Sequence, residues 1–178
     1  MRPRFLLAMC LFLPLTSYAA TLQQVVQVLA APAQKTDSPG DWARVNQLPG
    51  MKWKLPAPKQ TPVGFTRYGS LKLDGLGQVT VYFIGDRAGA QQASISLPEG
   101  VDKREFTATL QRLIPSAKIK QLRGGCKDEG ALGGSAVYQV DVPGAASVYA
   151  TMMTGVSKAG METELIIARQ LDKNWKCA

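Results

Sequence analysis

Apolar and polar residues alternate with a period of two over much of the chain, which is typical of half-buried strands. Between residues 65 and 97 this alternation, broken by turn residues at 74–77 and 85–89, predicts three antiparallel strands. Tyr82 and Ile84 make both faces of the middle strand apolar, so we expect the sheet to be covered on both sides there. The same period predicts four further strands, at residues 118–123, 135–142, 147–154 and 162–169.

Two segments show a helical period instead. Residues 21–31 predict a short helix with one apolar face, formed by Leu22, Val25, Val26 and Leu29. Residues 101–114 predict the main helix, which opens with the capping pair Asp102 and Glu105 and stops at Pro115. The order of elements is typical of a single α+β domain. We expect an antiparallel curved sheet of about six to seven strands, packed with the main helix and the short N-terminal helix.

Residues 36–64 show no steady period and carry five Pro and three Gly. A long irregular segment is unusual in a compact domain and is often functional. Because it contains Trp42 and Trp53, we expect these rings to hold it against the body of the protein. Residues 41–47 fit one short helical turn.

The first twenty residues resemble a cleaved signal peptide. Arg2 and Arg4 precede an apolar run at residues 5–15, and small residues follow at 16–20. The alternative is an uncleaved anchor, although the run is shorter than the roughly 20 residues that span a membrane. We therefore expect a mature chain of residues 21–178 in the bacterial periplasm, or secreted, with no membrane span.

Charge and cysteine content narrow the setting further. The chain has 21 Lys and Arg against 13 Asp and Glu, and loss of Arg2 and Arg4 leaves a mature net charge of +6. This charge either favours an anionic partner or only keeps the protein in solution. The basic residues are scattered, so we do not expect a nucleic-acid partner.

Cys126 and Cys177 are the two cysteines of the mature chain, and they are expected to form a disulfide in an oxidising compartment. The alternatives are a redox couple or a free nucleophile. A redox couple usually has its cysteines close together in sequence, whereas these two are far apart.

The chain contains no His, which excludes Ser-His-Asp and Cys-His catalysis and His-ligated metals. A pair of carboxylates is the enzymatic route that remains open. Asp128, Glu129 and Asp141 lack the spacing of a calcium loop. We expect no enzymatic activity, no cofactor and no metal.

Residues 124–134 form a loop with five Gly in eleven residues. It fits either a protruding loop that enters a partner's cleft, braced by Cys126, or a flexible hairpin connection. The candidate partner-binding residues are Lys127, Asp128, Glu129 and Leu132 of this loop, with Trp42 and Trp53 as the second choice. Lys118, Lys120 and Arg123 form a basic edge, which suits either anion binding or protection of a sheet edge.

These features favour a protein-binding module over an enzyme. The leading hypothesis is an inhibitor or immunity-type protein that neutralises another envelope or secreted protein, such as a toxin or an envelope hydrolase. The alternative is a periplasmic carrier of a small ligand or lipid, which requires a deep apolar pocket of roughly 300 Å³ or more between sheet and helix. The sequence does not indicate an oligomeric state.

Mass spectrometry of the exported protein tests the signal peptide and the disulfide together. The mature N-terminus should lie near residue 20, because the small residues 16–20 suit a signal peptidase. The intact mass should lie about 2 Da below that of the reduced protein, since pairing removes two thiol protons. Free thiols in the unreduced sample would contradict the Cys126–Cys177 bridge.

Overall fold

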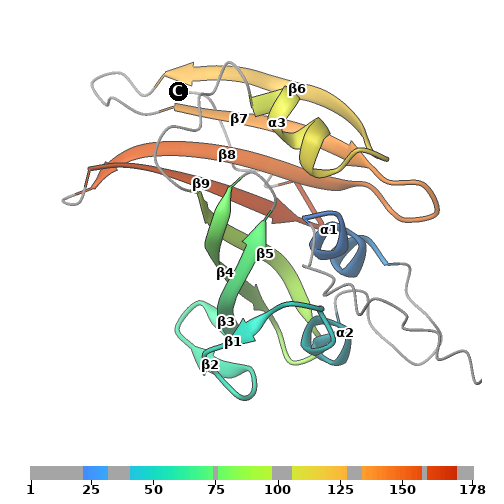
Figure 1. Ribbon diagram of the computed structural model, residues 1–178, viewed down its shortest axis with the longest axis vertical. Coiled ribbons are helices and arrows are strands. Elements are labelled where there is room, and N and C mark those ends of the chain that lie inside the picture. The colour runs from blue at the N-terminus through green and yellow to red at the C-terminus, as the bar shows by residue number, and fades with distance from the viewer. Residues whose placement is uncertain are drawn as a thin grey trace, which may run out of the picture.

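The computed structural model describes residues 22–31, 41–73, 76–97, 106–127, 134–157 and 160–171. They form three helices and nine strands (Figure 1). The helices are α1 (Leu22–Ala30), α2 (Trp42–Asn46) and α3 (Phe106–Leu113). The strands are β1 (Lys52–Trp53), β2 (Lys59–Thr61), β3 (Gly64–Leu73), β4 (Gly77–Gly85), β5 (Ala90–Leu97), β6 (Lys118–Lys127), β7 (Gly134–Asp141), β8 (Val148–Ser157) and β9 (Gly160–Ala168).

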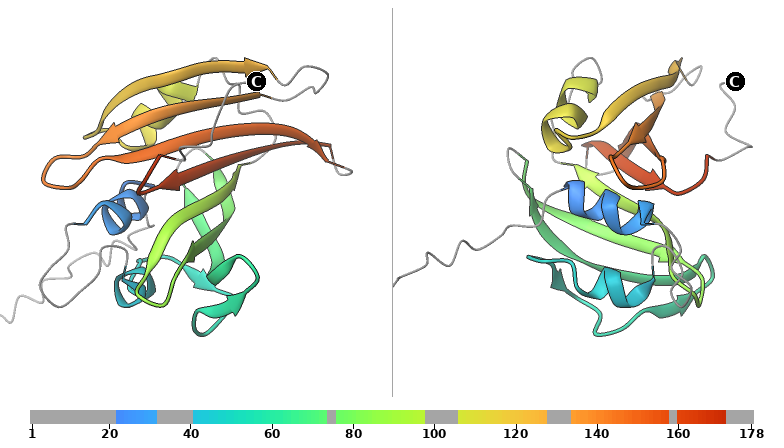
Figure 2. Two further views of the ribbon diagram at one scale, coloured as in Figure 1. Left: turned by 180° about the vertical axis from the view of Figure 1, so that it is seen from behind. Right: turned by 90° about the vertical axis from the view of Figure 1, so that its right-hand side faces the viewer.

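All nine strands belong to one open, curved antiparallel sheet. Its order is β1-β3-β4-β5-β9-β8-β7-β6, and β2 also pairs with β3. Strands β3–β5 form one group and β6–β9 another, and the ladder between β5 and β9 joins them. Figures 1 and 2 show the two groups running across each other, so that the sheet bends at this ladder. This architecture confirms the predicted α+β class.

The predicted strand number was too low. The seven strands expected from periodicity are all present, but β1 and β2 add two more within the segment predicted to be irregular. They contain two and three residues, too few to show an alternation in sequence. The expected helical turn is also present, as α2. Residues 36–40 of this segment lie outside the described part of the chain.

The hydrophobic core lies against one face of the sheet. The stripe predicted for α1 is buried, and in α3 Phe106 and Leu110 are buried as well. Across the sheet, the register lines up core residues on neighbouring strands, among them Ile95, Leu165 and Met152. Burying each such side chain contributes about 1.5–3 kcal/mol. The capping pair proposed for the main helix lies outside the described residues, which resume at Phe106.

The opposite side of the sheet, called the outer face here, is less covered. In the left view of Figure 2, α3 lies behind β6 and β7, and no described helix covers the near side of strands β6–β9. One register row crosses this face from β3 to β7: Tyr68, Tyr82, Ser94, Ile166, Thr151 and Val137. Tyr82 is 40% exposed, so the predicted cover over both faces of β4 is wrong at this residue. Its ring packs beside Tyr68 on the same face instead of beneath a second layer.

Gly69 of β3 allows β1 to approach closely, and replacing it tests how β1 is held. A Cβ at this position would lie 2.6 Å from the carbonyl oxygen of Lys52, which belongs to the backbone of β1. Gly69→Ala should therefore lower the free energy of unfolding by about 1–3 kcal/mol. Ser70→Ala is the matched control, because Ser70 lies next to Gly69 on the other face of β3. Equal stability of the two variants in urea unfolding would contradict this packing.

Candidate functional site

The two tryptophans proposed for partner binding hold the segment to the sheet. Trp42 is 9% exposed, and its indole nitrogen donates a 2.8 Å hydrogen bond to the carbonyl oxygen of Asp86. Trp53 is half-buried, with its ring centroid 6.0 Å from that of Phe83. The expectation that these rings pin the segment is confirmed. Their role in partner binding stays a prediction.

The Gly-rich loop falls mainly outside the described residues. Asp128, Glu129, Leu132 and Cys177 all lie in parts of the chain that the structure does not describe. Lys127 and Cys126 are described as backbone at the end of β6, opposite Gly134 and Ser135 of β7. The disulfide and the proposed contacts of this loop therefore stay predictions.

Arg67 of β3 binds residues 53–55, which lie on the core side of this strand. Its side chain is 5% exposed, its guanidinium carbon lies 4.1 Å from the ring centroid of Trp53, and Nε donates to the carbonyl oxygen of Leu55 at 3.2 Å. Nη1 is buried and has no hydrogen-bond partner among the described residues. Burial lowers the pKa of Arg67 below its usual range. This cation and the Trp53 ring fix the path of residues 53–55 along β3.

On the outer face, Tyr68 and Tyr82 stack on each other. Their ring centroids are 5.1 Å apart and their planes are inclined by 20°, which is an offset arrangement that aromatic rings favour. Further along this face, Met153 of β8 is 43% exposed opposite Glu164, whose carboxylate accepts a hydrogen bond from Ser94. Val137, at the far end of the row, is fully buried. The accessible apolar groups of the outer face are therefore centred on Tyr82 and Met153.

Four exposed lysines border the tyrosine pair, and we call them the lysine margin: Lys52, Lys54, Lys59 and Lys72. Lys52 pairs with Ser70, and the backbone nitrogen of Lys54 donates to the carbonyl oxygen of Tyr68 at 3.0 Å. Lys59 pairs with Thr66, and Lys72 follows in β3 itself. These register positions place all four on the outer face. Within the described part of the chain, no carboxylate pairs with any of them.

The lysine margin could have been found from the sequence, although the basic residues look scattered along the whole chain. No Asp or Glu occurs between Asp41 and Asp74, whereas the same stretch holds six basic residues. They are Arg44, Lys52, Lys54, Lys59, Arg67 and Lys72. Counting acids and bases separately along the chain is enough to locate this basic segment.

At the opposite margin of the outer face, formed by β6 and β7, lies an acidic residue, Asp141. The pKa of Asp141 is lowered by hydrogen bonds from Ser147, at 2.5 Å, and from Gln139, at 2.9 Å, and further by the charges of Lys118 and Lys120. Asp141 of β7 thus partly balances the positive charge of the basic edge predicted on β6. The two margins of the sheet therefore differ in electrostatic character.

A polar hollow of about 440 Å³ lies where β4 and β9 end and β5 begins. Its carboxylate, Asp86, is held by the backbone nitrogens of Ala88 and Gly89 at 2.8 and 3.0 Å. The hollow is lined by Asp86, Gln91, Gln92, Ala168, Arg169 and Gln170. Gln92 of this hollow pairs with Ile84. On the outer face, this pair is the next one after Tyr82 and Ser94, so the hollow lies beside the tyrosine pair.

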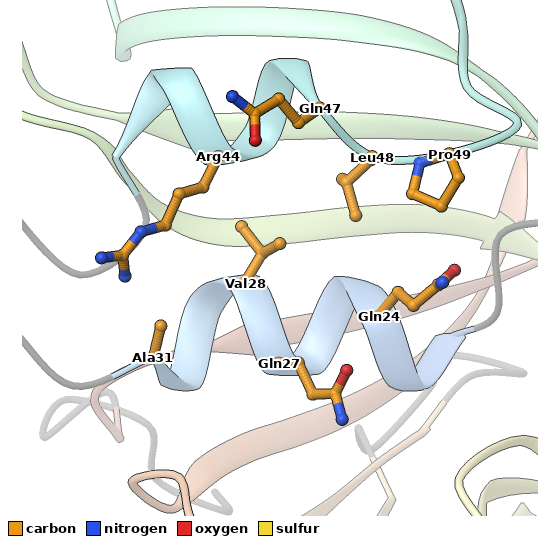
Figure 3. Close-up of a pocket in the computed structure, with 8 residues that line it drawn as sticks. All are labelled: Gln24, Gln27, Val28, Ala31, Arg44, Gln47, Leu48 and Pro49. Atoms are coloured by element: carbon orange, nitrogen blue, oxygen red, sulfur yellow. The ribbon is translucent and has the colours of Figure 1, made fainter.

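A second concavity, an open groove of about 380 Å³, runs between α1 and α2 (Figure 3). Val28 of α1 faces Leu48 across it, with Arg44 towards one end and Gln24 towards the other (Figure 3). The groove lies between two helices, whereas the predicted carrier needs a pocket between sheet and helix. In that layer, Phe83, Ile95 and Leu110 are fully buried and belong to one core cluster.

Comparison of the chain with models of protein families, with curated proteins and with solved structures found no match. Among the described residues, no helix is long and apolar enough to cross a membrane. The same residues contain no group of three or more His, Cys, Asp or Glu side chains suited to hold a metal ion.

The contacts of Asp141 predict a measurable effect on its titration. A carboxyl group whose pKa is lowered in the folded state contributes stability above its unfolded pKa, and this contribution is lost as the pH falls through the folded pKa. Ser147→Ala removes the largest cause of the shift, so the pKa of Asp141 should rise towards its ordinary value. Carboxyl NMR titration measures this directly. Lys118→Ala, which removes only a smaller Coulombic contribution, should raise the pKa less.

Proposed function

We propose that this chain is an exported, non-enzymatic protein-binding module that blocks or neutralises another envelope or secreted protein, as an inhibitor or immunity protein does. The observation that supports the proposal most directly is the outer face, with its stacked and accessible tyrosine pair. Tyr is among the residues that dominate binding energy at protein interfaces. Met, which the outer face exposes at Met153, is also enriched there.

The geometry of the tyrosine pair suits a binding surface. Tyr68 and Tyr82 are paired residues on β3 and β4, in the middle of a nine-residue ladder that runs from Phe65 to Leu73. Their backbones are therefore fixed, and each ring limits the rotation of the other. A partner that contacts Tyr82 would lose less side-chain entropy than one that contacts a mobile residue, and this saving favours affinity.

The proposals that the chain is exported and that it is not an enzyme are based on the sequence. The signal-like residues 1–20 support a location in the periplasm or outside the cell. The absence of His removes the most common general base, which supports a function that depends on binding.

A carrier of small ligands or lipids is the second candidate, and the groove between α1 and α2 favours it. Its apolar wall includes Val28, Leu48 and Pro49, and its volume falls within the range of ligand pockets. Such pockets usually bury more than about 70% of a ligand's surface. A groove that is open along its length covers less, so we rank the carrier below the protein-binding module.

Copurification from periplasmic extract, followed by affinity measurement with the recovered protein, tests the proposed function. Tyr82→Ala should weaken binding at least tenfold, or about 1.4 kcal/mol, because it removes the most exposed ring of the outer face. Val63→Ala is the control, since it trims a 70% exposed apolar side chain in the turn between β2 and β3. Its affinity should stay within twofold of the wild type.

Three results would contradict the proposal. One is recovery of the chain with no stoichiometric protein. Another is an equal loss of affinity in the Tyr82 and Val63 variants. The third is copurification of a small apolar ligand that leaves when Val28 is changed to Arg, and this result would favour the carrier.

A further inference from the structure

The proposed function does not specify the chemistry of the partner, and the lysine margin indicates what that chemistry is. We infer that the partner is an acidic protein surface, whose carboxylates lie against Lys52, Lys54, Lys59 and Lys72 while its apolar centre covers the tyrosine pair. The inference rests on the proposed function, because it concerns the same outer face. It adds the charge of the partner and the side of the face on which that charge lies.

The first step is that the charge of the margin is not balanced within the described structure. The four lysines are exposed, none pairs with a described carboxylate, and Arg67 adds a buried cation on the core side of β3. By contrast, the lysines on β6 lie close enough to Asp141 to lower its pKa. An approaching carboxylate therefore meets, on the β1–β3 side of the tyrosine pair, a cluster of lysines that no described carboxylate balances, whereas Asp141 partly balances the lysines at the opposite margin.

The second step is that the backbone of the margin is fixed. β1 and β2 both pair with β3. On the core side, Arg67 packs on the ring of Trp53 and donates a hydrogen bond to the carbonyl oxygen of Leu55, which holds residues 53–55 beside β3. Lys52 lies in β1 and Lys54 follows directly after it, so their Cα atoms are at most about 6.5 Å apart. The ammonium groups keep their freedom, whereas strand pairing and the hydrogen bond from Lys54 to Tyr68 set the positions of their Cα atoms beside β3.

The third step is the arrangement of apolar and charged groups. Protein interfaces have an apolar centre rich in aromatic residues and a polar rim that water reaches. Here Tyr68 and Tyr82 form the centre, and the lysines form one side of the rim. Complementary charge at a rim accelerates association and selects the partner more than it raises affinity. A partner with carboxylates on the matching side of its own rim satisfies this pattern.

A protein fits this surface better than a nucleic-acid strand or a membrane. Binding of a nucleic-acid strand uses bases stacked on open ring faces along a continuous groove, whereas these two rings stack on each other. Insertion into a membrane would use Val63, the most exposed large apolar residue described. Val63 lies five residues from Tyr68, or about 16 Å along a strand. A membrane would therefore engage the turn between β2 and β3, away from the tyrosine centre.

The test uses three defined anions: a poly-L-glutamate peptide, heparin, and vesicles of phosphatidylglycerol. Binding of each to the mature protein is followed by titration, with K52E/K54E as the principal variant. K118E/K120E is the matched control, since it changes the same charge at the same spacing on the outer face, at the opposite margin. Poly-L-glutamate should bind the wild type, should bind K52E/K54E at least tenfold more weakly, and should bind the control within twofold of the wild type. Raising the salt concentration should weaken the binding to the wild type.

Several outcomes would overturn the inference. Poly-L-glutamate that does not bind, or that binds both double variants equally weakly, would show that the margin has no special role. Selective loss of heparin or vesicle binding alone in K52E/K54E would assign the margin to a glycan or a membrane. Thermal unfolding checks that each variant is folded, and K59E/K72E provides a second variant on the same margin with the same expected loss.

The partner recovered by copurification separates this inference from the proposed function. If Tyr82→Ala weakens that complex and K52E/K54E does not, the protein-binding function stands and the acidic partner surface is wrong. If neither variant weakens it, both are wrong. If both weaken it, and the K52E/K54E effect disappears at high salt, the partner is held as inferred.

Discussion

The pairing of β5 with β9 is the constraint on which the rest of this structure depends. In the sheet order of the described strands it is the one ladder between β3–β5 and β6–β9, and it aligns residues 92–97 with residues 163–168. Either group alone would expose an apolar face. Joined at β5 and β9, they present a single concave face, on which α1 contacts both β5 and β8. The core, the bend of the sheet and the continuity of the outer face all follow from this one ladder.

The outer face owes its character to the polar alternate positions of the same strands. Core positions on β4 are Val79, Val81 and Phe83, so the residues between them must face the other side. Sequence places Tyr82 there, and the register sets Tyr68 opposite. The lysines of β1 and β2 lie on this face because both strands pair with β3, and Arg67 with Trp53 holds residues 53–55 beside it. The make-up of the outer face is thus a consequence of how the core and its edge are packed.

Long elements with a clear period could be predicted from the sequence, and short ones could not. The stripe of α1 and the alternation of β4 identify those elements and their buried residues correctly. β1 and β2 form because β3 offers an edge on which both can pair, and Arg67 holds Leu55 between them by a hydrogen bond. Neither strand is long enough to show a period in sequence. Tyr82 could not be assigned to an open face by its apolar character alone. Its exposure depends on which helices cover which face, and periodicity within one strand does not contain that information.

The ladder between β5 and β9 also bears on when the protein acquires its structure. The hydrogen bond from Ser94 to Glu164 links residues 70 positions apart, whereas most other ladders join neighbours in the chain. Contacts of such long sequence separation form slowly, because the entropy of closing the loop is lost before the contact stabilises anything. The two strand groups would each form locally, with the joining ladder last. For export as proposed above, a late closing step would lengthen the interval in which translocation can precede folding.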